Sequence, residues 1–342
     1  MQAQAAVIQP DFSLKLQSQP IPQPGQDEVL IKVAYCGICG TDVHMLQAGF
    51  FPPDCIIGHE LSGHIAEIGE SVNAWKTGDP VIVLPMNPCG ECPACRKGQI
   101  QCCFESVIRG YGVGLNPGGF SQYMVVNVST LFPMPEGLDM KTAALTEPWA
   151  VAVHGVKVSN LQIGDQALVM GAGPIGLLCI YALKIGGAGK IIVTEPDPFR
   201  LKKAIAAGAD LVLDPHSVNP SEMILNKFGR APDIVFDCAG TASSLEEAAM
   251  IVGSHGQIIV LGVHQGNVTF FPLPWFIKEI NLKFSLAYAF DDFRSSIEFL
   301  AKGAVNPEVI ISRTMPLSNI AEAFKALEGS GESKIMIDCQ AV

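Results

Sequence analysis

The chain has 342 residues, of which 49% are hydrophobic and 16% charged, which is enough apolar material for two domains that each bury a core. Its formal net charge is −11 and its lysines and arginines are scattered, which argues against a nucleic-acid partner. No basic and apolar leader is visible and no apolar run approaches about 18 residues, so we expect a cytoplasmic protein that does not contact a membrane.

The first part of the chain is predicted to be rich in β-strands. Short apolar or alternating runs are separated by turns rich in proline and glycine, such as residues 20–25. The expected strands span residues 5–9, 14–17, 28–34, 61–68, 80–84 and 119–126. Alternation of helices with strands begins only near Thr142, which predicts a barrel-like domain followed by a doubly wound sheet.

Cysteine, histidine and acidic residues suggest a catalytic metal site in this β-rich part. Cys39 offers a soft thiolate and His59 an imidazole, and a catalytic zinc commonly takes three protein ligands and keeps one position open. Two carboxylates could supply the third ligand: Glu60, beside His59, and Glu147, which precedes a proline. Taken singly, each residue also has a structural interpretation, as a buried cysteine, a hydrogen-bonded histidine or a solvated glutamate.

A second group of cysteines predicts a structural metal. The chain holds 11 cysteines, an odd number, and the spacing of several favours metal thiolates in a reducing compartment over disulfides. Cys89, Cys92, Cys95 and Cys103 have C-x2-C-x2-C-x7-C spacing and leave no open position, which is typical of a structural zinc. An iron–sulfur cluster is the alternative, and Cys102 could replace Cys103 as the fourth ligand.

A dinucleotide-binding pattern lies near the middle of the chain. Residues 166–170 read as a buried strand, and Gly171, Gly173 and Gly176 follow at G-x-G-x-x-G spacing before an apolar helix at residues 177–185. Gly171 permits the tight turn, Gly173 lets the backbone approach a pyrophosphate, and Gly176 lets the helix pack on the strand.

An acidic residue after the next strand favours NAD as the cofactor. The apolar run 190–194 ends at Glu195, whose carboxylate can accept hydrogen bonds from the adenosine ribose hydroxyls and would repel a 2′-phosphate. Arg200, a helical turn further on, could soften this preference and is included among the cofactor-binding candidates. Further buried strands are expected at residues 211–213, 234–238 and 257–262, with a helix at residues 244–252.

Together these motifs resemble the medium-chain, zinc-dependent alcohol dehydrogenase family over essentially the whole chain. The resemblance rests, in the family's order, on Gly37-Ile-Cys-Gly-Thr-Asp42, Gly58-His59-Glu60, the four-cysteine loop, Glu147-Pro148 and Gly171-Ala-Gly-Pro-Ile-Gly176. It implies an α/β protein with a β-rich, barrel-like (GroES-like) catalytic domain at residues 1–151 and 289–342. Residues 152–288 would form the NAD-binding Rossmann domain, a doubly wound parallel sheet. The resemblance also implies that Cys39 and His59 bind a catalytic zinc, the four cysteines a structural zinc, and the glycine turn with Glu195 NAD.

Glu147 indicates the branch of the family. Simple-alcohol dehydrogenases of the family have a cysteine at this position, whereas its polyol (sorbitol-like) and threonine dehydrogenases have glutamate followed by proline, as in this chain. In relatives of that kind the counterpart of Glu60 binds the zinc directly while that of Glu147 holds the zinc-bound water, or the two exchange roles, so both stay candidates. Residues 281–288 resemble the strand through which family members form dimers, and bacterial members are commonly tetramers. We therefore expect a homo-oligomer, a tetramer or a dimer.

The resemblance implies hydride transfer between NAD and a secondary alcohol, such as a polyol, a sugar or a cyclitol. In similar proteins the counterparts of Thr41 and His44 relay the hydroxyl proton to solvent, and Asp42 is expected to be structural. The residues expected to position the nicotinamide are Pro174, Ile175, Gly262 and Val263.

Two other functions stay open from the sequence. L-Threonine 3-dehydrogenase is the alternative enzyme, although relatives of that kind usually carry a histidine inside the four-cysteine loop and this chain has none there. The other is a noncatalytic protein that binds zinc and dinucleotide as a stabiliser or sensor, against which Thr41 and His44 argue. Phe50, Phe51 and Trp149 are candidates to line a substrate pocket, with core packing as the alternative.

Overall fold

The computed structural model describes every residue except Gln265 and Ser330, and its contacts divide the chain into two compact units. Unit 1 comprises Met1–Glu147, Ala289–Gly303 and Ile311–Val342. Unit 2 comprises Pro148–Tyr288 and Ala304–Ile310. Among the helices of the described residues, none is both long and apolar enough to cross a membrane.

Unit 1 is built on a seven-stranded mixed sheet and a two-stranded antiparallel sheet of β1 and β2. The larger sheet has the order β14-β15-β3-β4-β5-β7, and β6 also pairs with β3. The strands are β1 (Gln2–Ile8), β2 (Leu14–Pro20), β3 (Glu28–Gly37), β4 (Glu60–Ile68), β5 (Pro80–Val83), β6 (Tyr123–Asn127), β7 (Leu131–Pro133), β14 (Ile311–Pro316) and β15 (Lys334–Asp338).

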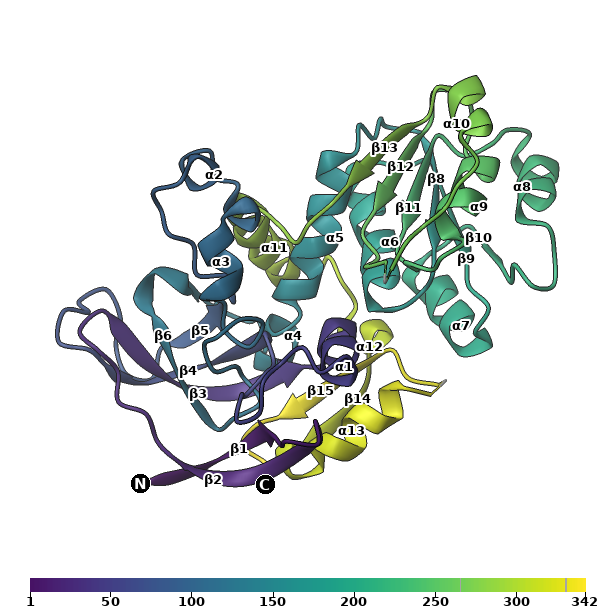
Figure 1. Ribbon diagram of the computed structural model, residues 1–342. Coiled ribbons are helices and arrows are strands. Elements are labelled where there is room, and N and C mark those ends of the chain that lie inside the picture. Colours follow the sequence, from purple (N-terminus) through teal and green to yellow (C-terminus); the bar gives the residue numbers. More distant parts are fainter. Residues whose placement is uncertain (265, 330) are drawn as a thin grey trace. The chain divides into compact units, whose positions relative to one another are not determined.

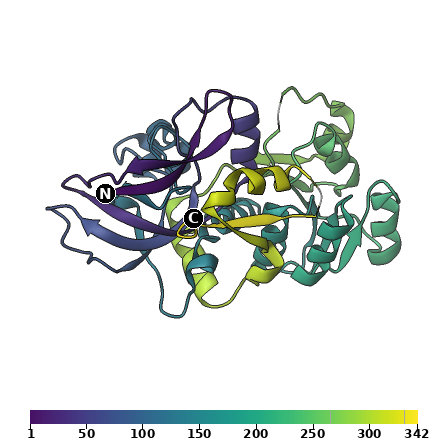
Figure 2. The same ribbon diagram turned by 90° about the horizontal axis from the view of Figure 1, so that it is seen from below.

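The C-terminal segment completes the sheet that the N-terminal segment begins. β15 pairs antiparallel with β3 and parallel with β14, and both views show the yellow C-terminal strands beside the purple N-terminal ones (Figure 1, Figure 2). Side chains from both segments share one apolar core, where the rings of Phe120 and Phe324 meet edge to face with centroids 5.8 Å apart. The pairing with β3 thereby brings residues of the C-terminal segment close to residues of the N-terminal segment.

Short helices surround the sheets of unit 1. They are α1 (Gly40–Gln47), α2 (Pro93–Arg96), α3 (Phe104–Ile108), α4 (Met140–Ala143), α11 (Phe290–Ala301) and α13 (Ile320–Leu327). Helix α5 (Thr146–Val158) begins in unit 1 and continues in unit 2.

Unit 2 is a doubly wound, all-parallel sheet with the strand order β10-β9-β8-β11-β12-β13. Helices α6 and α7 pack against each other on one face, and α8, α9 and α10 cover the other (Figure 1). The order reverses between β8 and β11, and ligands of such sheets bind beyond the strand ends at this point. The strands are β8 (Gln166–Met170), β9 (Lys190–Thr194), β10 (Leu211–Leu213), β11 (Ile234–Asp237), β12 (Gln257–Val260) and β13 (Asn281–Phe284). The helices are α6 (Pro174–Gly186), α7 (Pro198–Ala207), α8 (Pro220–Phe228), α9 (Ser244–Ile251), α10 (Pro272–Lys278) and α12 (Pro307–Ile310).

The predicted fold class is confirmed, and many element boundaries shift by one to three residues, as in β1, β2 and β12; three of the differences have a clear place in the sheet pairing. The strand expected at residues 28–34 extends to Gly37, because β4 and β15 pair with its last residues. The strand expected at residues 119–126 begins only at Tyr123, because the N–H of Gly119 bonds to Gly58 in a neighbouring loop. The strand expected at residues 281–288 ends at Phe284.

Candidate functional site

A cysteine, a histidine and a glutamate meet where β3 ends and β4 begins. Cys39 is the N-cap of α1, two residues after the end of β3, and His59 immediately precedes Glu60, the first residue of β4. The antiparallel register places Gly37 opposite Glu60, which brings the two strand ends together. One ligand atom from each of Cys39, His59 and Glu60 lies within 4.8 Å of the others.

Asp42 orients two of these residues from behind. One of its carboxylate oxygens accepts the backbone N–H of Cys39 at 3.0 Å, and the other lies 3.3 Å from Nδ1 of His59. Burial lowers the pKa of His59, but the charge of Asp42 and contacts with Asp42 and Cys39 outweigh it and raise that pKa well above its usual value. Asp42, expected from the sequence to be structural, thus contacts two ligand candidates, and carboxylates commonly orient metal-binding histidines in this way.

The donor set fits zinc. The facing atoms Nδ1 of His59 and Oδ1 of Asp42 are buried without a well-directed hydrogen bond, which leaves the imidazole set for a metal on its other nitrogen. A thiolate, an imidazole and a carboxylate suit zinc and do not suit magnesium or calcium, which prefer oxygen ligands alone.

Glu60 is held by a buried lysine from the far end of the chain. Nζ of Lys334 lies 2.6 and 2.7 Å from the two oxygens of Glu60 and donates to the carbonyl of Ile38 at 2.9 Å. A Cβ on Gly37 would collide with Oε2 of Glu60, so glycine leaves room for this carboxylate. Nothing near Glu60 in the sequence pointed to Lys334.

Glu147 lies in the first turn of α5 and is partly buried. Its charge acts on Lys334, together with the charges of Glu60 and Cys39. Glu147 is not part of the cluster of ligand atoms within 4.8 Å, whereas Glu60 is.

The two residues expected to relay the proton lie on α1. Thr41 is partly buried, and its backbone N–H donates to Sγ of Cys39 at 3.4 Å. His44 is exposed and lies three residues further along, on the same side of the helix as Thr41. The pair therefore runs from the cysteine toward the surface.

The four-cysteine loop brings its sulfurs together at the separation that zinc requires. Sγ of Cys89 lies 3.9 Å from that of Cys95 and 3.7 Å from that of Cys103. Four thiolates about 2.3 Å from one zinc ion in a tetrahedron are about 3.8 Å from each other. An iron–sulfur cluster divides its four cysteines among two or more iron atoms, which keeps some of the sulfurs further apart, whereas all four sulfurs here lie within 4.8 Å of one another, so the spacing favours zinc.

Burial and position favour Cys103 over Cys102 as the fourth candidate ligand. Cys103 is buried and belongs to the cluster, whereas Cys102 is exposed and does not. Backbone N–H groups of Cys92 and Glu91 donate to Sγ of Cys89 and lower the pKa of that thiol, which favours the thiolate that binds a metal.

In unit 2 the predicted glycine turn joins β8 to α6. Gly171 has φ +89°, which only glycine adopts without strain, and a Cβ on Gly176 would collide with the carbonyl of Gly171. Gly173 is the N-cap of α6 and Pro174 its first residue, with Ile175 next. The backbone thus offers free N–H groups at a helix N-terminus, where a phosphate binds favourably.

Glu195 is bonded to this turn. It is 4% exposed, and its oxygens accept the N–H of Ala172 at 2.7 Å and that of Asp197 at 2.9 Å. Arg200 lies in the first turn of α7, and its Nε is buried and has no acceptor among the described residues.

A buried carboxylate organises the loop that contains Gly262 and Val263. Asp237, at the end of β11, is fully buried and lies 2.8 Å from Nε2 of His264. It also accepts the hydroxyl of Ser244 at 2.7 Å and the N–H of Gly240 at 3.0 Å. Gly262 packs against Gly240, and Val263 is exposed. No spacing in the sequence pointed to the contact between Asp237 and His264.

The aromatic candidates separate by burial. Phe51 and Trp149 are 2% and 0% exposed and belong to the core. Phe50 is 64% exposed and meets Phe51 edge to face at 5.7 Å, so of the three only Phe50 presents its ring to solvent.

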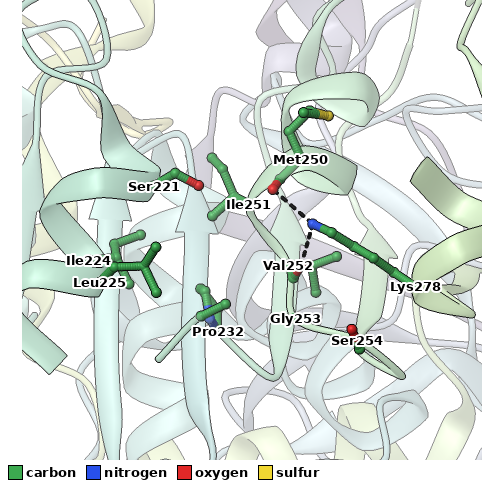
Figure 3. Close-up of a pocket in the computed structure, with 11 residues that line it drawn as sticks. Ser221, Ile224, Leu225, Pro232, Met250, Ile251, Val252, Gly253, Ser254 and Lys278 are labelled. Atoms are coloured by element: carbon green, nitrogen blue, oxygen red, sulfur yellow. Dashed lines mark hydrogen bonds between the residues drawn. The ribbon is translucent and has the colours of Figure 1, made fainter. Parts of the chain in front are cut away.

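A cavity of about 290 Å³ lies elsewhere in unit 2, between α8 and α9 (Figure 3). Apolar side chains such as Ile224 line it, and Lys278 donates to the carbonyls of Met250 and Val252 at the end of α9. None of the predicted site residues lines this cavity.

Comparisons with known proteins agree with these observations. Residues 25–136 match the alcohol dehydrogenase GroES-like domain, and residues 174–302 match the zinc-binding dehydrogenase family. The chain is 34% identical to 2-dehydro-3-deoxy-L-galactonate 5-dehydrogenase of Pseudoalteromonas atlantica, over 94% of this chain and 93% of that protein. It is 33% identical to sorbitol dehydrogenase of Bacillus subtilis, over 97% of this chain and 96% of that protein.

A solved structure extends this likeness to three dimensions. It is a zinc-binding dehydrogenase from Sinorhizobium meliloti bound to NADP, with a TM-score of 0.92, 29% identity and 99% of each chain covered. The chain belongs to the zinc-dependent medium-chain alcohol dehydrogenase family, in its polyol dehydrogenase branch.

Proposed function

We propose that the protein oxidises a secondary hydroxyl group of a polyol or a sugar acid with NAD⁺, or catalyses the reverse reduction. The observation that carries the proposal is the cluster of Cys39, His59 and Glu60 in a chain that also has a dinucleotide turn. A relative named for a sugar acid and another named for sorbitol indicate the substrate class. Polyols and sugar acids carry further oxygens beside each hydroxyl carbon, which suits a metal with a hard carboxylate ligand.

Cys39 and His59, with a carboxylate of Glu60 or Glu147, would hold the catalytic zinc. When bound, zinc acts as a Lewis acid that lowers the pKa of a hydroxyl group, as it lowers that of water from about 16 to about 7. Asp42 fixes the ring of His59, and Lys334 fixes the carboxylate of Glu60. The chain therefore supplies a preorganised donor set.

Thr41 and His44 are proposed to carry the hydroxyl proton to solvent. Thr41 is partly buried beside Cys39, and His44 is exposed on the same helix, so a proton accepted at the threonine hydroxyl has an exit at the imidazole. An imidazole nitrogen can accept a proton and pass it to water.

Glu195 supports NAD over NADP as the cofactor. Each of its oxygens accepts one backbone N–H, which leaves lone pairs for ribose hydroxyls and a negative charge that opposes a 2′-phosphate. The Sinorhizobium relative is bound to NADP, and Arg200 offers a buried Nε nearby, so both cofactors belong in the test. Pro174, Ile175, Gly262 and Val263 are proposed to position the nicotinamide.

We also propose that the protein is a cytoplasmic homo-oligomer that associates through β13. This strand is an edge strand of the sheet in unit 2. Large exposed apolar side chains occur on it and on the segments that precede and follow it in the sequence. They are Phe270, Phe271, Phe276, Ile277, Phe284 and Leu286. An edge strand with apolar side chains can pair with its symmetry mate in a dimer, and two such dimers would give the tetramer. The cysteines are free, which fits a reducing compartment.

The test is NADH formation by the zinc-loaded protein with polyols, sugars, sugar acids, cyclitols, threonine and simple secondary alcohols, each with NAD⁺ and with NADP⁺. We expect turnover of one polyhydroxylated class and two zinc ions per chain. Activity on threonine alone would contradict the proposal and would show that the protein is an L-threonine 3-dehydrogenase. Two bound zinc ions without turnover would favour the noncatalytic sensor.

A further inference from the structure

Lys334 is a fully buried cation beside the predicted catalytic metal site. It is the first residue of β15 and is 1% exposed, and its ammonium uses its three donors on Glu60 and the carbonyl of Ile38. The N–H of Ile38 bonds in turn to the carbonyl of Ile335, which ties the loop before α1 to β15. The position of the ammonium is therefore fixed by two strands and a loop.

Stability alone does not explain this pair. A buried ion pair loses about as much hydration energy as it gains in attraction, and apolar side chains of similar volume are often as stable. The ammonium contacts Glu60, and Cys39 and Glu147 are near enough for electrostatic interaction with it, so one cation acts on three of the ligand candidates.

The geometry makes Lys334 and a metal compete for one carboxylate. Glu60 has both oxygens within 2.7 Å of Nζ, and one of them also lies within 4.8 Å of the ligand atoms of Cys39 and His59. A carboxylate has about four lone-pair sites, so Glu60 can keep its bond to Lys334 and still offer a weakened donor to zinc.

On the basis of the proposed function, we infer that Lys334 is a positioning residue that holds Glu60 as a weak, exchangeable zinc ligand and offsets the negative charge of the donor set. Glu60 then yields its place readily, and the site keeps a position open for a substrate oxygen.

The test compares zinc release by the holoenzyme and its Lys334→Met variant, in which an apolar side chain of similar length replaces the ammonium. Without the competing cation, Glu60 should donate more strongly to the metal, so we expect a chelator to remove the catalytic zinc more slowly, by about tenfold, the size of effect that partners of metal ligands have. The ligand-field bands of the cobalt-substituted enzyme should shift. The variant should show a lower kcat with a smaller change in KM. Lys334→Arg should keep the zinc release rate, the cobalt bands and kcat of the unaltered enzyme, because arginine keeps the charge and binds a carboxylate with two donors.

A double variant separates this role from a structural one. In the Glu60→Gln background the ligand that Lys334 controls is gone, so adding Lys334→Met should leave zinc release and the cobalt bands unchanged. The thermal midpoint is measured for each variant, so that a general loss of stability is distinguished from a change at the zinc site. If Lys334→Met does not fold, Lys334→Gln keeps a donor for Ile38 and takes its place.

Unchanged or faster zinc release in the Lys334 variant, or the same change in the Glu60→Gln background, would overturn the inference. These readouts need no substrate. Two zinc ions without turnover would therefore defeat the proposed function while the metal measurements still decide the role of Lys334.

Discussion

The carboxylate of Glu195 accepts the backbone N–H of Ala172 at 2.7 Å, so the end of β9 is bonded to the turn that follows β8. Ala172 stands between Gly171, which permits the tight turn, and Gly173, where the backbone approaches the pyrophosphate in folds of this kind. One side chain thus supports the turn and carries the charge proposed to select NAD.

Replacing Glu195 with glutamine should weaken NAD⁺ binding and reduce its preference over NADP⁺. The amide NH₂ would face a backbone N–H where a carboxylate oxygen now accepts one, and hydrogen bonds to charged groups are worth about 1.5–3 kcal/mol. We expect the KM for NAD⁺ to rise about tenfold or more. The control is Glu246→Gln, at an exposed position of α9. A Glu195→Gln variant with unchanged KM values for both cofactors would contradict the role of this carboxylate.

Two glycines of the turn should respond differently to alanine. A Cβ on Gly176 would collide with the carbonyl of Gly171, whereas a Cβ on Gly173 meets no atom within 4 Å. We expect Gly176→Ala to lower the free energy of unfolding by about 1–3 kcal/mol. Gly173→Ala should keep the thermal midpoint and lose affinity for NADH, because its methyl group occupies the path of the pyrophosphate. Thermal unfolding and NADH titration check both; a destabilised Gly173→Ala would refute the contrast.

What could be predicted from the sequence was chemistry carried by closely spaced residues. The glycines after β8 and the cysteines from Cys89 onward specify their geometry within one turn or loop, and the alternation of strands and helices predicted the doubly wound sheet. Lys334 could not be found, because 274 positions separate it from Glu60 and only the pairing of β15 with β3 brings them together. Asp42 could have been found, since it stands three residues after Cys39, where an acidic side chain caps the start of a helix.

The four-cysteine loop allows a matched pair of variants. Cys103→Ser should remove one zinc ion per chain and lower the thermal midpoint, since a structural zinc site can contribute on the order of 10 kcal/mol to folding. Cys102→Ser should keep two zinc ions and the original midpoint, because Cys102 is exposed and lies outside the cluster. Metal analysis and thermal unfolding give the answer. If Cys102→Ser loses a zinc ion and Cys103→Ser keeps both, Cys102 and not Cys103 is the fourth ligand.

Asp42→Asn should weaken the catalytic zinc site about tenfold, because the partner that orients His59 loses its charge. The change is measured by competition with a chelator. Asp27→Asn, at an exposed position of unit 1, is the control. Equal zinc affinity in the two variants would show that Asp42 does not contribute to zinc binding.

The same contact predicts a pH dependence in the zinc-free protein. Since Asp42 raises the pKa of His59 above 6.5 despite burial, the protonated ring stabilises the folded state fully below about pH 6.5. That contribution is lost as the pH rises through the raised pKa. Zinc must displace the same proton, so zinc affinity should rise over this range, and Asp42→Asn should move the rise to lower pH. An identical pH profile in both proteins would show that Asp42 does not control this proton.

The exposed apolar side chains beside β13 lead to a prediction about assembly. Phe284 lies on the last strand of the sheet and is 69% exposed, a position that is costly in water and favourable in a dimer in which β13 pairs with its symmetry mate. Phe284→Glu would place like charges opposite each other across that axis, so sedimentation should show a mass reduced at least by half. Ile163→Glu is the matched control, because Ile163 is 93% exposed in unit 2 and lies in a loop apart from β13. If Phe284→Glu leaves the mass of the assembly unchanged, the subunits do not associate through this strand. If both variants reduce that mass, exposed apolar side chains hold the subunits together without specific pairing of β13.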